Sequence, residues 1–302
     1  MKPNDLRQKL NSGVISFPVT PFKKDLSLDL EGHRRNLRFI LQYPLTAIIA
    51  PAGTGEMYSL SPEEHLAVVK ATVKEVDGKV PVLTGVGFNY PLAIQLAKQS
   101  AKAGAAGILA LPPYFPGADE QGLFEYYKAI GGATKLGLLV YSRDWVNPGP
   151  AFVQKLADAV PNLIAWKDGQ ADTRRYQAIM NHVGDRLHWI GGAGDDAVPA
   201  YYSIGIRTFT SSIATIAPGL SIKLHLLAAA GDTAELLDLM RAYVVPLYAL
   251  RSRRKGYEVS VMKAFMDQIG LRGGPCRPPL PDVSAQELKE IKALVAKYKP
   301  VL

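Results

Sequence analysis

Short runs of apolar and β-branched residues recur along the first two thirds of the chain, and longer amphipathic segments separate them. Runs that are apolar throughout and alternate with helical segments are typical of buried parallel strands joined by helices. We therefore predict eight parallel strands, within runs that begin at Val14, Thr46, Val80, Gly107, Gly137, Leu163, His188 and Thr208.

The segments between these runs carry helix signals at their ends. Ser61 and Glu64 can form a capping box, and Pro62 occupies the first helical position of the same segment. The next segment ends at Gly104, and glycine commonly terminates helices. After residue 217 the pattern stays helical, and a proline- and glycine-rich break over 270–281 precedes a final amphipathic helix.

Eight strands that alternate with helices predict a closed (β/α)₈ TIM barrel, whose active site lies at the carboxyl ends of the strands. We expect this barrel to span residues 1–217, with residues 218–302 forming a C-terminal helical region packed on it. A doubly wound open sheet is the rival fold, and it would place a glycine-rich dinucleotide fingerprint after the first strand. The sequence there is VTPFKKD, so we favour the barrel.

Composition excludes several classes of protein. The 302 residues are 48% hydrophobic and 21% charged, as expected of a globular protein with a large core. No apolar stretch reaches the length of a membrane span, and the first residues lack the apolar core of a signal peptide, so we expect a cytoplasmic protein without a membrane partner. The single cysteine, Cys276, has no partner for a disulfide.

The net charge of +8 raises the question of nucleic-acid binding. RSRRK at 251–255 is the one dense basic cluster, and no aromatic residues are interleaved with it. We interpret it as a solvated helix face and predict no nucleic-acid partner. A positive balance also favours a small anionic substrate.

Metal and nucleotide chemistry have little support. The five histidines fall at no ligand spacing, and PAGTGE at 51–56 is not followed by the Gly-Lys-Ser/Thr of a phosphate-binding loop. We therefore predict no metal site and no nucleotide-binding loop. The turn Gly53–Thr54–Gly55 can instead direct backbone N–H groups toward an anion, although an ordinary strand-to-helix turn is the simpler interpretation.

Lys167 and Tyr141 end the sixth and fifth predicted strands, which are neighbours in a simple barrel. A lysine held among apolar side chains has a lowered pKa and can act as a nucleophile, and a nearby phenol can carry protons for imine formation. The two residues outline a Schiff-base site. The alternative is that the lysine is simply solvated and the tyrosine packs against the core.

Three more side chains at the strand ends are candidate substrate contacts. Arg143 follows the fifth strand, and we favour it over Arg174 and Arg175, just past the sixth strand, as the contact for a second carboxylate of the substrate. The alternative is a surface ion pair of Arg143 with Asp144 or Asp168. Ser211 and Ser212 end the eighth strand and can contact a substrate hydroxyl or carboxylate, or cap the strand end.

These features together resemble the dihydrodipicolinate synthase and N-acetylneuraminate lyase family of class I aldolases and dehydratases. The similarity runs from about Val14 to the C-terminal helices and includes GTGE after strand two, PPYFPGADEQGLFEYY after strand four and GAGDD after strand seven. It implies a Schiff base between Lys167 and a 2-oxo acid, Tyr141 as proton shuttle, and a substrate carboxylate bound by Gly53, Thr54 and Gly55. It implies no metal or organic cofactor.

Departures from the family pattern narrow the choice of activity. YSRDWVNP and WKDGQADTRR resemble the branch that acts on sugar diacids, whereas Val146 stands where the synthases have a substrate-binding arginine. This resemblance implies conversion of 5-dehydro-4-deoxy-D-glucarate to 2,5-dioxopentanoate, water and carbon dioxide. A pyruvate-dependent aldolase or hydratase-aldolase acting on another 2-keto-3-deoxy sugar acid, and a non-catalytic sugar-acid-binding protein, remain alternatives.

The resemblance also implies a homotetramer built from dimers. Phe115 stands where the synthases have a tyrosine that reaches across a dimer, with Tyr114 beside it. The implied partners are thus a small 2-oxo sugar acid and further copies of the chain.

Overall fold

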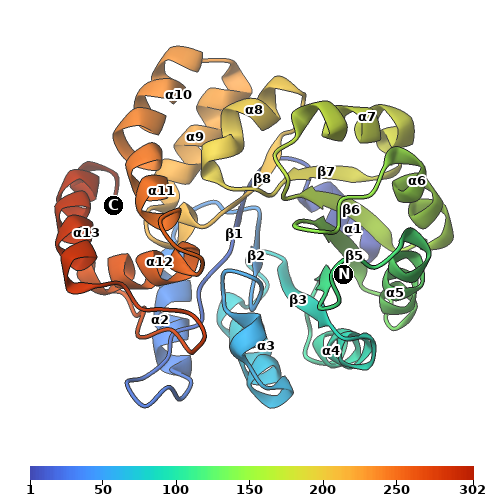
Figure 1. Ribbon diagram of the computed structural model, residues 1–302, viewed down its shortest axis with the longest axis horizontal. Helices are drawn as coiled ribbons and strands as arrows, with labels where there is room; N and C mark the ends of the chain where they lie inside the picture. The colour runs from blue at the N-terminus through green and yellow to red at the C-terminus, as the bar shows by residue number, and fades with distance from the viewer.

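Eight parallel strands form a closed barrel, surrounded by helices (Figure 1). In this computed structural model, which describes residues 1–302, each strand pairs with the next and β8 closes the barrel against β1. The predicted barrel is therefore confirmed, and every predicted run overlaps one of its strands. The strands are β1 (Gly13–Ser16), β2 (Ala47–Ile49), β3 (Val82–Phe88), β4 (Gly107–Pro113), β5 (Gly137–Ser142), β6 (Leu163–Asp168), β7 (His188–Gly191) and β8 (Thr208–Ser211).

One helix follows each strand. The predicted capping box is present, since Ser61 Oγ accepts from the Glu64 N–H at 3.2 Å and Glu64 Oε2 accepts from the Ser61 N–H at 3.0 Å. The helices are α2 (Leu30–Ile40), α3 (Pro62–Val76), α4 (Tyr90–Lys102), α5 (Glu120–Gly132), α6 (Pro150–Ala159), α7 (Thr173–Val183), α8 (Val198–Ser203) and α9 (Pro218–Ala230).

A short helix that the sequence pattern did not predict precedes the barrel. It is α1 (Pro3–Lys9), whose Leu6 is fully buried. A Cβ atom added to Gly107 or Gly137 would lie 2.5 or 3.1 Å from Leu6 Cδ2, so α1 packs on the amino ends of β4 and β5. These glycines make room for the leucine, which covers the end of the barrel opposite the predicted site.

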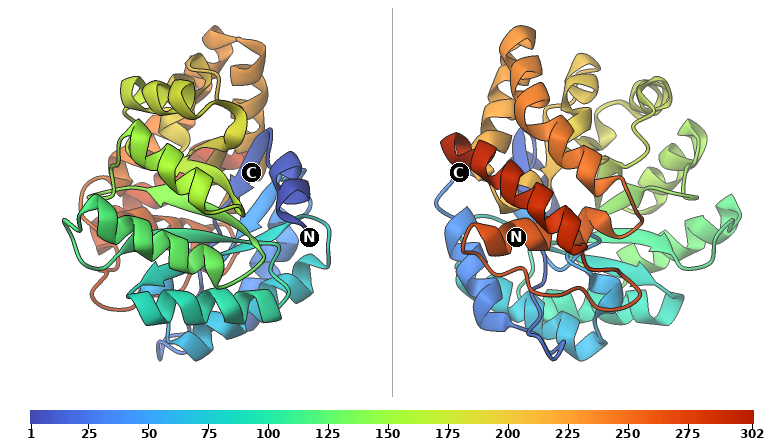
Figure 2. Two further views of the ribbon diagram at one scale, coloured as in Figure 1. Left: turned by 90° about the vertical axis from the view of Figure 1, so that its right-hand side faces the viewer. Right: turned by 60° about the vertical axis from the view of Figure 1, so that its left-hand side comes forward.

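The last third of the chain is helical, as predicted. After α9 come α10 (Thr233–Leu239), a π-helical turn (Met240–Val244), α11 (Val245–Arg251), α12 (Tyr257–Gln268) and α13 (Ala285–Tyr298). The orange and red helices gather on one side of the barrel (Figure 2). None of the helices of the protein combines the length and the apolar character needed to cross a membrane.

Two hydrophobic cores underlie this arrangement. One cluster of 55 buried residues fills the barrel and the space between its strands and helices, and a second of 20 lies among α9 to α13. The second also includes Val19 and Ile213 from the loops after β1 and β8. The boundary predicted at residue 217 stays a prediction, since the second core draws on residues before it.

Polar contacts connect the barrel loops to the C-terminal region. We call the four residues that make them, Glu56, Glu64, Lys263 and Arg277, the seam. Lys263 of α12 and Glu56 of the 51–56 turn form an ion pair, and both side chains are almost wholly inaccessible. Arg277 makes two hydrogen bonds of 2.6 Å to the Glu64 carboxylate, and its backbone N–H donates to Glu56 Oε2 at 3.2 Å. The loop after β2 is therefore held from the C-terminal side.

Candidate active site

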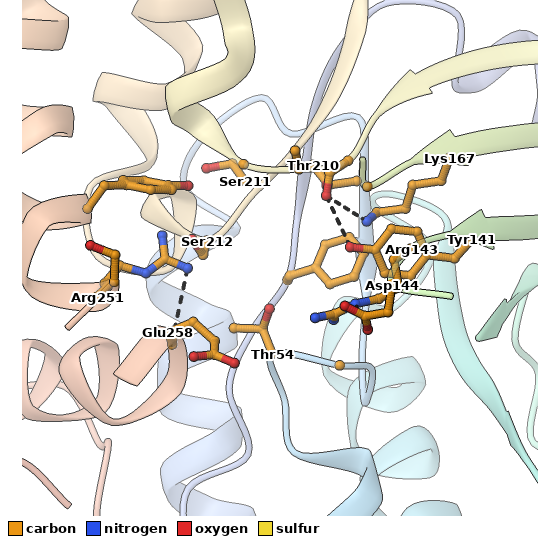
Figure 3. A pocket seen from close by; sticks show the side chains of 18 of the residues that line it. Thr54, Tyr141, Arg143, Asp144, Lys167, Thr210, Ser211, Ser212, Arg251 and Glu258 are labelled. Carbon is orange, nitrogen blue, oxygen red and sulfur yellow. Dashed lines mark hydrogen bonds and ion pairs between the residues drawn. The ribbon is translucent and has the colours of Figure 1, made fainter. Parts of the chain in front are cut away.

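Lys167 and Tyr141 lie side by side at the carboxyl ends of β6 and β5. They are register partners, and their side chains point into the barrel (Figure 3). The Lys167 Nζ donates to the carbonyl of Gly192 at 3.0 Å, and the Tyr141 hydroxyl donates to the same oxygen at 3.2 Å. The Nζ also lies over the tyrosine ring, 3.2 Å from its centroid. The structure thus brings together the two residues that the sequence singled out.

The environment of Lys167 favours the neutral amine. The side chain is 2% exposed, and no carboxylate pairs with it. Asp168 is next in sequence, but strand alternation directs it outward, where it accepts from the Tyr201 hydroxyl of α8 at 2.8 Å. Burial therefore lowers the pKa of Lys167 well below its ordinary value of 10.5, and the positive charge of Arg143 lowers it further against a smaller opposing effect of Asp168.

The phenol of Tyr141 is kept protonated. Burial raises its pKa, and this effect outweighs the lowering by the nearby Arg143 guanidinium. Tyr141 is therefore a proton donor near neutral pH, beside an amine that is a potential acceptor. Because both groups contact one carbonyl oxygen, a carbonyl carbon attacked by Nζ would also come close to the phenol.

Two glycines make this arrangement possible. A Cβ on Gly192 would lie 2.5 Å from Lys167 Cγ and 2.6 Å from its Nζ, and a Cβ on Gly169 would lie 2.6 Å from Tyr141 Cε2. Real Cβ atoms essentially never approach other atoms so closely. The glycines of GGAG and KDG therefore provide the space that the reacting groups occupy.

The Gly53–Thr54–Gly55 turn follows β2 and forms part of the same cavity. Gly53 and Thr54 line it, whereas Gly55 is buried and its carbonyl accepts from the Thr20 hydroxyl at 2.8 Å. A Cβ on Gly55 would lie 2.7 Å from the carbonyl oxygen of Pro18, so the turn packs closely on the loop after β1. Its predicted role in carboxylate binding stays a prediction.

Arg143 lies between this turn and Tyr141. Its Nε forms an ion pair with Asp144 at 2.9 Å, which is the surface pairing considered from the sequence. Its guanidinium lies 5.6 Å from the Tyr141 ring centroid, and its Nη1 would be 3.7 Å from a Cβ on Gly53. Arg143 therefore lies at the same end of the cavity as the lysine, and its predicted contact with a second carboxylate stays a prediction.

The two predicted serines face different surroundings. The Ser211 hydroxyl is directed away from the barrel axis, where it donates to Asp195, accepts from the Ala214 N–H at 2.8 Å and contacts Ser221 of α9 at 2.8 Å. Both serines border the cavity, but the Ser212 hydroxyl makes no hydrogen bond within the chain. The substrate contact predicted for Ser211 stays a prediction, and the geometry favours Ser212.

The cavity above these groups measures about 630 Å³ and is mostly polar. Its far side comes from the C-terminal region, including Tyr248, Arg251 and Glu258 (Figure 3). All five residues of RSRRK border it, and residues 252–255 are exposed. The interpretation of this cluster as a solvated helix face was therefore wrong in one respect, because these residues form one side of the candidate site.

Sequence reasoning missed the place of several residues in the cavity, among them Thr210, Phe17, Tyr248 and Arg251. Strand alternation from Ser212 could have identified Thr210, whose hydroxyl is 3.4 Å from the Gly191 carbonyl. Phe17 lies beyond β1 and places its ring centroid 5.3 Å from Lys167 Nζ. Tyr248 and Arg251 are on α11, and no local signal connects a helix after the barrel with the carboxyl ends of the strands.

The chain contains no group of three or more His, Cys, Asp or Glu side chains arranged to hold a metal ion. The absence of a cofactor from the reaction stays a prediction. The described groups are an amine, a phenol, hydroxyls, guanidinium groups and backbone donors, which suit covalent chemistry on an anionic carbonyl compound.

The sequence is similar over nearly its whole length to one family of known proteins. The model of the dihydrodipicolinate synthetase family matches residues 10–298. A probable 5-dehydro-4-deoxyglucarate dehydratase of Bradyrhizobium diazoefficiens is 39% identical, over 100% of this chain and 96% of its own length. A probable 5-dehydro-4-deoxyglucarate dehydratase of Rhodococcus opacus is 38% identical, over 98% of each chain.

Solved structures agree with this match. A dihydrodipicolinate synthase from Oceanobacillus iheyensis superimposes with a TM-score of 0.91 at 26% identity, over 98% of this chain and 99% of its own. That of Bacillus clausii gives a TM-score of 0.91 at 25% identity, over 97% and 99%. The likeness extends over the barrel and the C-terminal helices together.

Proposed function

The chain belongs to the dihydrodipicolinate synthetase family, and on this premise we propose that it is a decarboxylating 5-dehydro-4-deoxyglucarate dehydratase acting through a Schiff base on Lys167. The observation that carries the proposal is the buried Lys167 amine, which lacks a carboxylate partner and lies 3.2 Å from the Tyr141 ring centroid, at the base of a cavity. The full-length relatives that carry this enzyme name support the substrate.

Imine formation follows from the geometry. The neutral Nζ attacks the ketone carbon of the 2-oxo acid, Tyr141 passes the protons that the carbinolamine requires, and loss of water leaves an iminium. The N–H groups of Gly53–Thr54–Gly55 hold the carboxylate next to the ketone, and Arg143 adds positive charge at that end.

The iminium then serves two eliminations. It acidifies the adjacent methylene, and removal of that proton gives an enamine, which expels the hydroxyl on the next carbon. The resulting conjugated iminium accepts the electron pair of the bond to the distal carboxylate, which leaves as carbon dioxide. Protonation, tautomerisation of the enol to the aldehyde and hydrolysis release 2,5-dioxopentanoate and regenerate the free lysine.

Borohydride trapping tests this proposal. The enzyme is incubated with 5-dehydro-4-deoxyglucarate and borohydride, and its intact mass and peptide map are measured, while carbon dioxide release is followed in a sample without borohydride. We expect a reduced adduct on Lys167 together with carbon dioxide. Tyr141→Phe should form the adduct about 10²–10⁴-fold more slowly, the usual effect of losing a general acid–base group.

Other outcomes point to the alternatives. An adduct with pyruvate alone would favour an aldolase or hydratase-aldolase acting on another sugar acid. Absence of an adduct with either compound would overturn the covalent mechanism and favour a binding protein that retains the fold.

We also propose a homotetramer in the cytoplasm. Tyr114 and Phe115 support association between copies, because they are 80% and 71% exposed beside Tyr90 and form an aromatic surface away from the cavity. Light scattering of the purified protein measures the mass of the assembly, and a monomer would contradict this part of the proposal.

A further inference from the structure

Arg251 occupies an unusual position on the far side of the cavity from Lys167. It is the last residue of α11, and its guanidinium carbon lies 4.3 Å from the Tyr248 ring centroid, beside Ser212 (Figure 3). Its Nε and Nη1 are buried without a hydrogen-bond partner, and its Nη2 has only the Glu258 carbonyl at 3.5 Å. A guanidinium has five N–H donors and keeps its charge, so most of its capacity is unused.

Two other arginines that border the cavity are paired, and a third, Arg254, is exposed to solvent without an ion pair. Arg251 alone among them combines buried donors with the lack of a partner. Arg253, two residues on, makes hydrogen bonds of 2.7 and 3.1 Å to the Glu290 carboxylate, and Arg143 pairs with Asp144. Glu258 also faces the cavity, but its carboxylate accepts from the Gly256 N–H at 2.9 Å, and no carboxylate of the chain forms an ion pair with Arg251. Arg251 is partly buried, and Asp195 and Asp196 lie near enough to feel its charge without contacting it. Its two buried donors are nevertheless unfilled, and such donors beside a cavity mark a place for an anion.

We propose that Arg251 binds the terminal carboxylate of the substrate, at the end far from the Schiff base. This inference rests on the proposed function, which gives the substrate two carboxylates. Arg143 lies on the lysine side of the cavity, Arg251 and the free hydroxyl of Ser212 lie on the opposite side, and Thr54 of the turn lies between them (Figure 3). A chain attached at Lys167 therefore directs its distal end toward Arg251, and the C-terminal region selects diacids.

The chemistry of the reaction limits how this contact acts. The distal carboxylate leaves as neutral carbon dioxide, so a guanidinium bound to it stabilises the ground state more than the transition state of decarboxylation. Removing Arg251 should therefore raise KM without lowering the rate constant of that step. Arg251 is thus a contact for binding and specificity.

Two 2-oxo acids of equal chain length test the effect of the terminal carboxylate alone. 2-Oxoadipate carries it and 2-oxohexanoate lacks it. We expect borohydride to trap 2-oxoadipate on Lys167 at about 10- to 100-fold lower concentration than 2-oxohexanoate, the range for charge-assisted hydrogen bonds. Arg251→Gln should remove this preference and leave trapping of pyruvate unchanged. Arg241→Gln, which removes the same charge from the exposed surface of the C-terminal region outside the cavity, should retain the preference.

The outcomes distinguish the two proposals. If the wild-type enzyme traps none of the three acids, the Schiff base at Lys167 fails, and with it the proposed function. If pyruvate is trapped normally but Arg251→Gln keeps the preference for 2-oxoadipate, only the role of Arg251 is overturned. A loss of preference of equal size in Arg241→Gln would show a general charge effect and would also overturn it.

Discussion

Two lysines of this protein are equally buried, but only one of them has a carboxylate partner. Lys167 at the mouth of the barrel and Lys263 in the seam are 2% and 1% exposed, and each Nζ lies over an aromatic ring. Lys263 has a full set of partners, since it forms an ion pair with Glu56 and donates to the Pro275 carbonyl at 2.9 Å. Lys167 has one carbonyl oxygen and no carboxylate.

The difference separates a structural lysine from a reactive one. A buried cation that is paired remains an ammonium, which has no lone pair to attack a carbonyl. A buried amine without an anion is poorly stabilised in its charged form, and the cost of burying it lowers its pKa. Burial alone therefore does not identify a nucleophile, whereas burial without a counter-ion does.

The strongest test of the comparison is Lys167→Met, which keeps the length of the side chain and removes the amine. We expect turnover to fall to background. We also expect the free energy of unfolding at neutral pH to rise by about 0.5–2 kcal/mol, because the variant no longer pays for desolvating a titratable group. Urea unfolding followed by circular dichroism gives the stability. A variant that is inactive and markedly less stable would contradict this role.

Lys263→Met should have the reverse effect. It leaves Glu56 buried without a cation, which typically costs about 3–5 kcal/mol. Activity per folded molecule should be largely retained, measured below the unfolding transition, because the amine at Lys167 is untouched. The double variant Glu56→Gln, Lys263→Met is the control: it removes both charges and keeps an acceptor for the Arg277 N–H, so most of the lost stability should return.

Ser211 and Ser212 offer the same comparison between a group with partners in the protein and a group without them, here with neutral hydroxyls. Ser211→Ala removes a donor to the buried Asp195 and should lower the free energy of unfolding by about 1–3 kcal/mol. Ser212→Ala removes a hydroxyl without a partner in the chain, so stability should change by less than about 0.5 kcal/mol, while KM for the sugar acid rises. Equal losses of stability in both variants would show that Ser212 is also part of the structure.

Sequence reasoning succeeded where the signal was local. The apolar runs predicted the strands, and the alternation of strand residues placed Lys167 and Tyr141 on one surface. It did not predict α1, whose seven residues are too few for a period to emerge. It also could not connect Arg251 or Lys263 with the barrel, because those contacts depend on how the C-terminal helices pack and not on spacing along the chain.

The smallest expected effect is on the pH dependence of stability, which compares the wild-type protein with Lys167→Met. The folded pKa of Lys167 is lowered, so between that value and 10.5 the unfolded chain binds a proton that the native protein does not. Unfolding is then favoured as pH falls, and native stability rises with pH across this window.

Lys167→Met lacks this contribution, and all other titrating groups are common to both proteins. Its stability advantage should therefore shrink as pH rises from neutral toward 10.5, in parallel urea titrations. An advantage that stays constant over this range would mean that Lys167 keeps its proton in the folded protein, and the contrast with Lys263 would be lost.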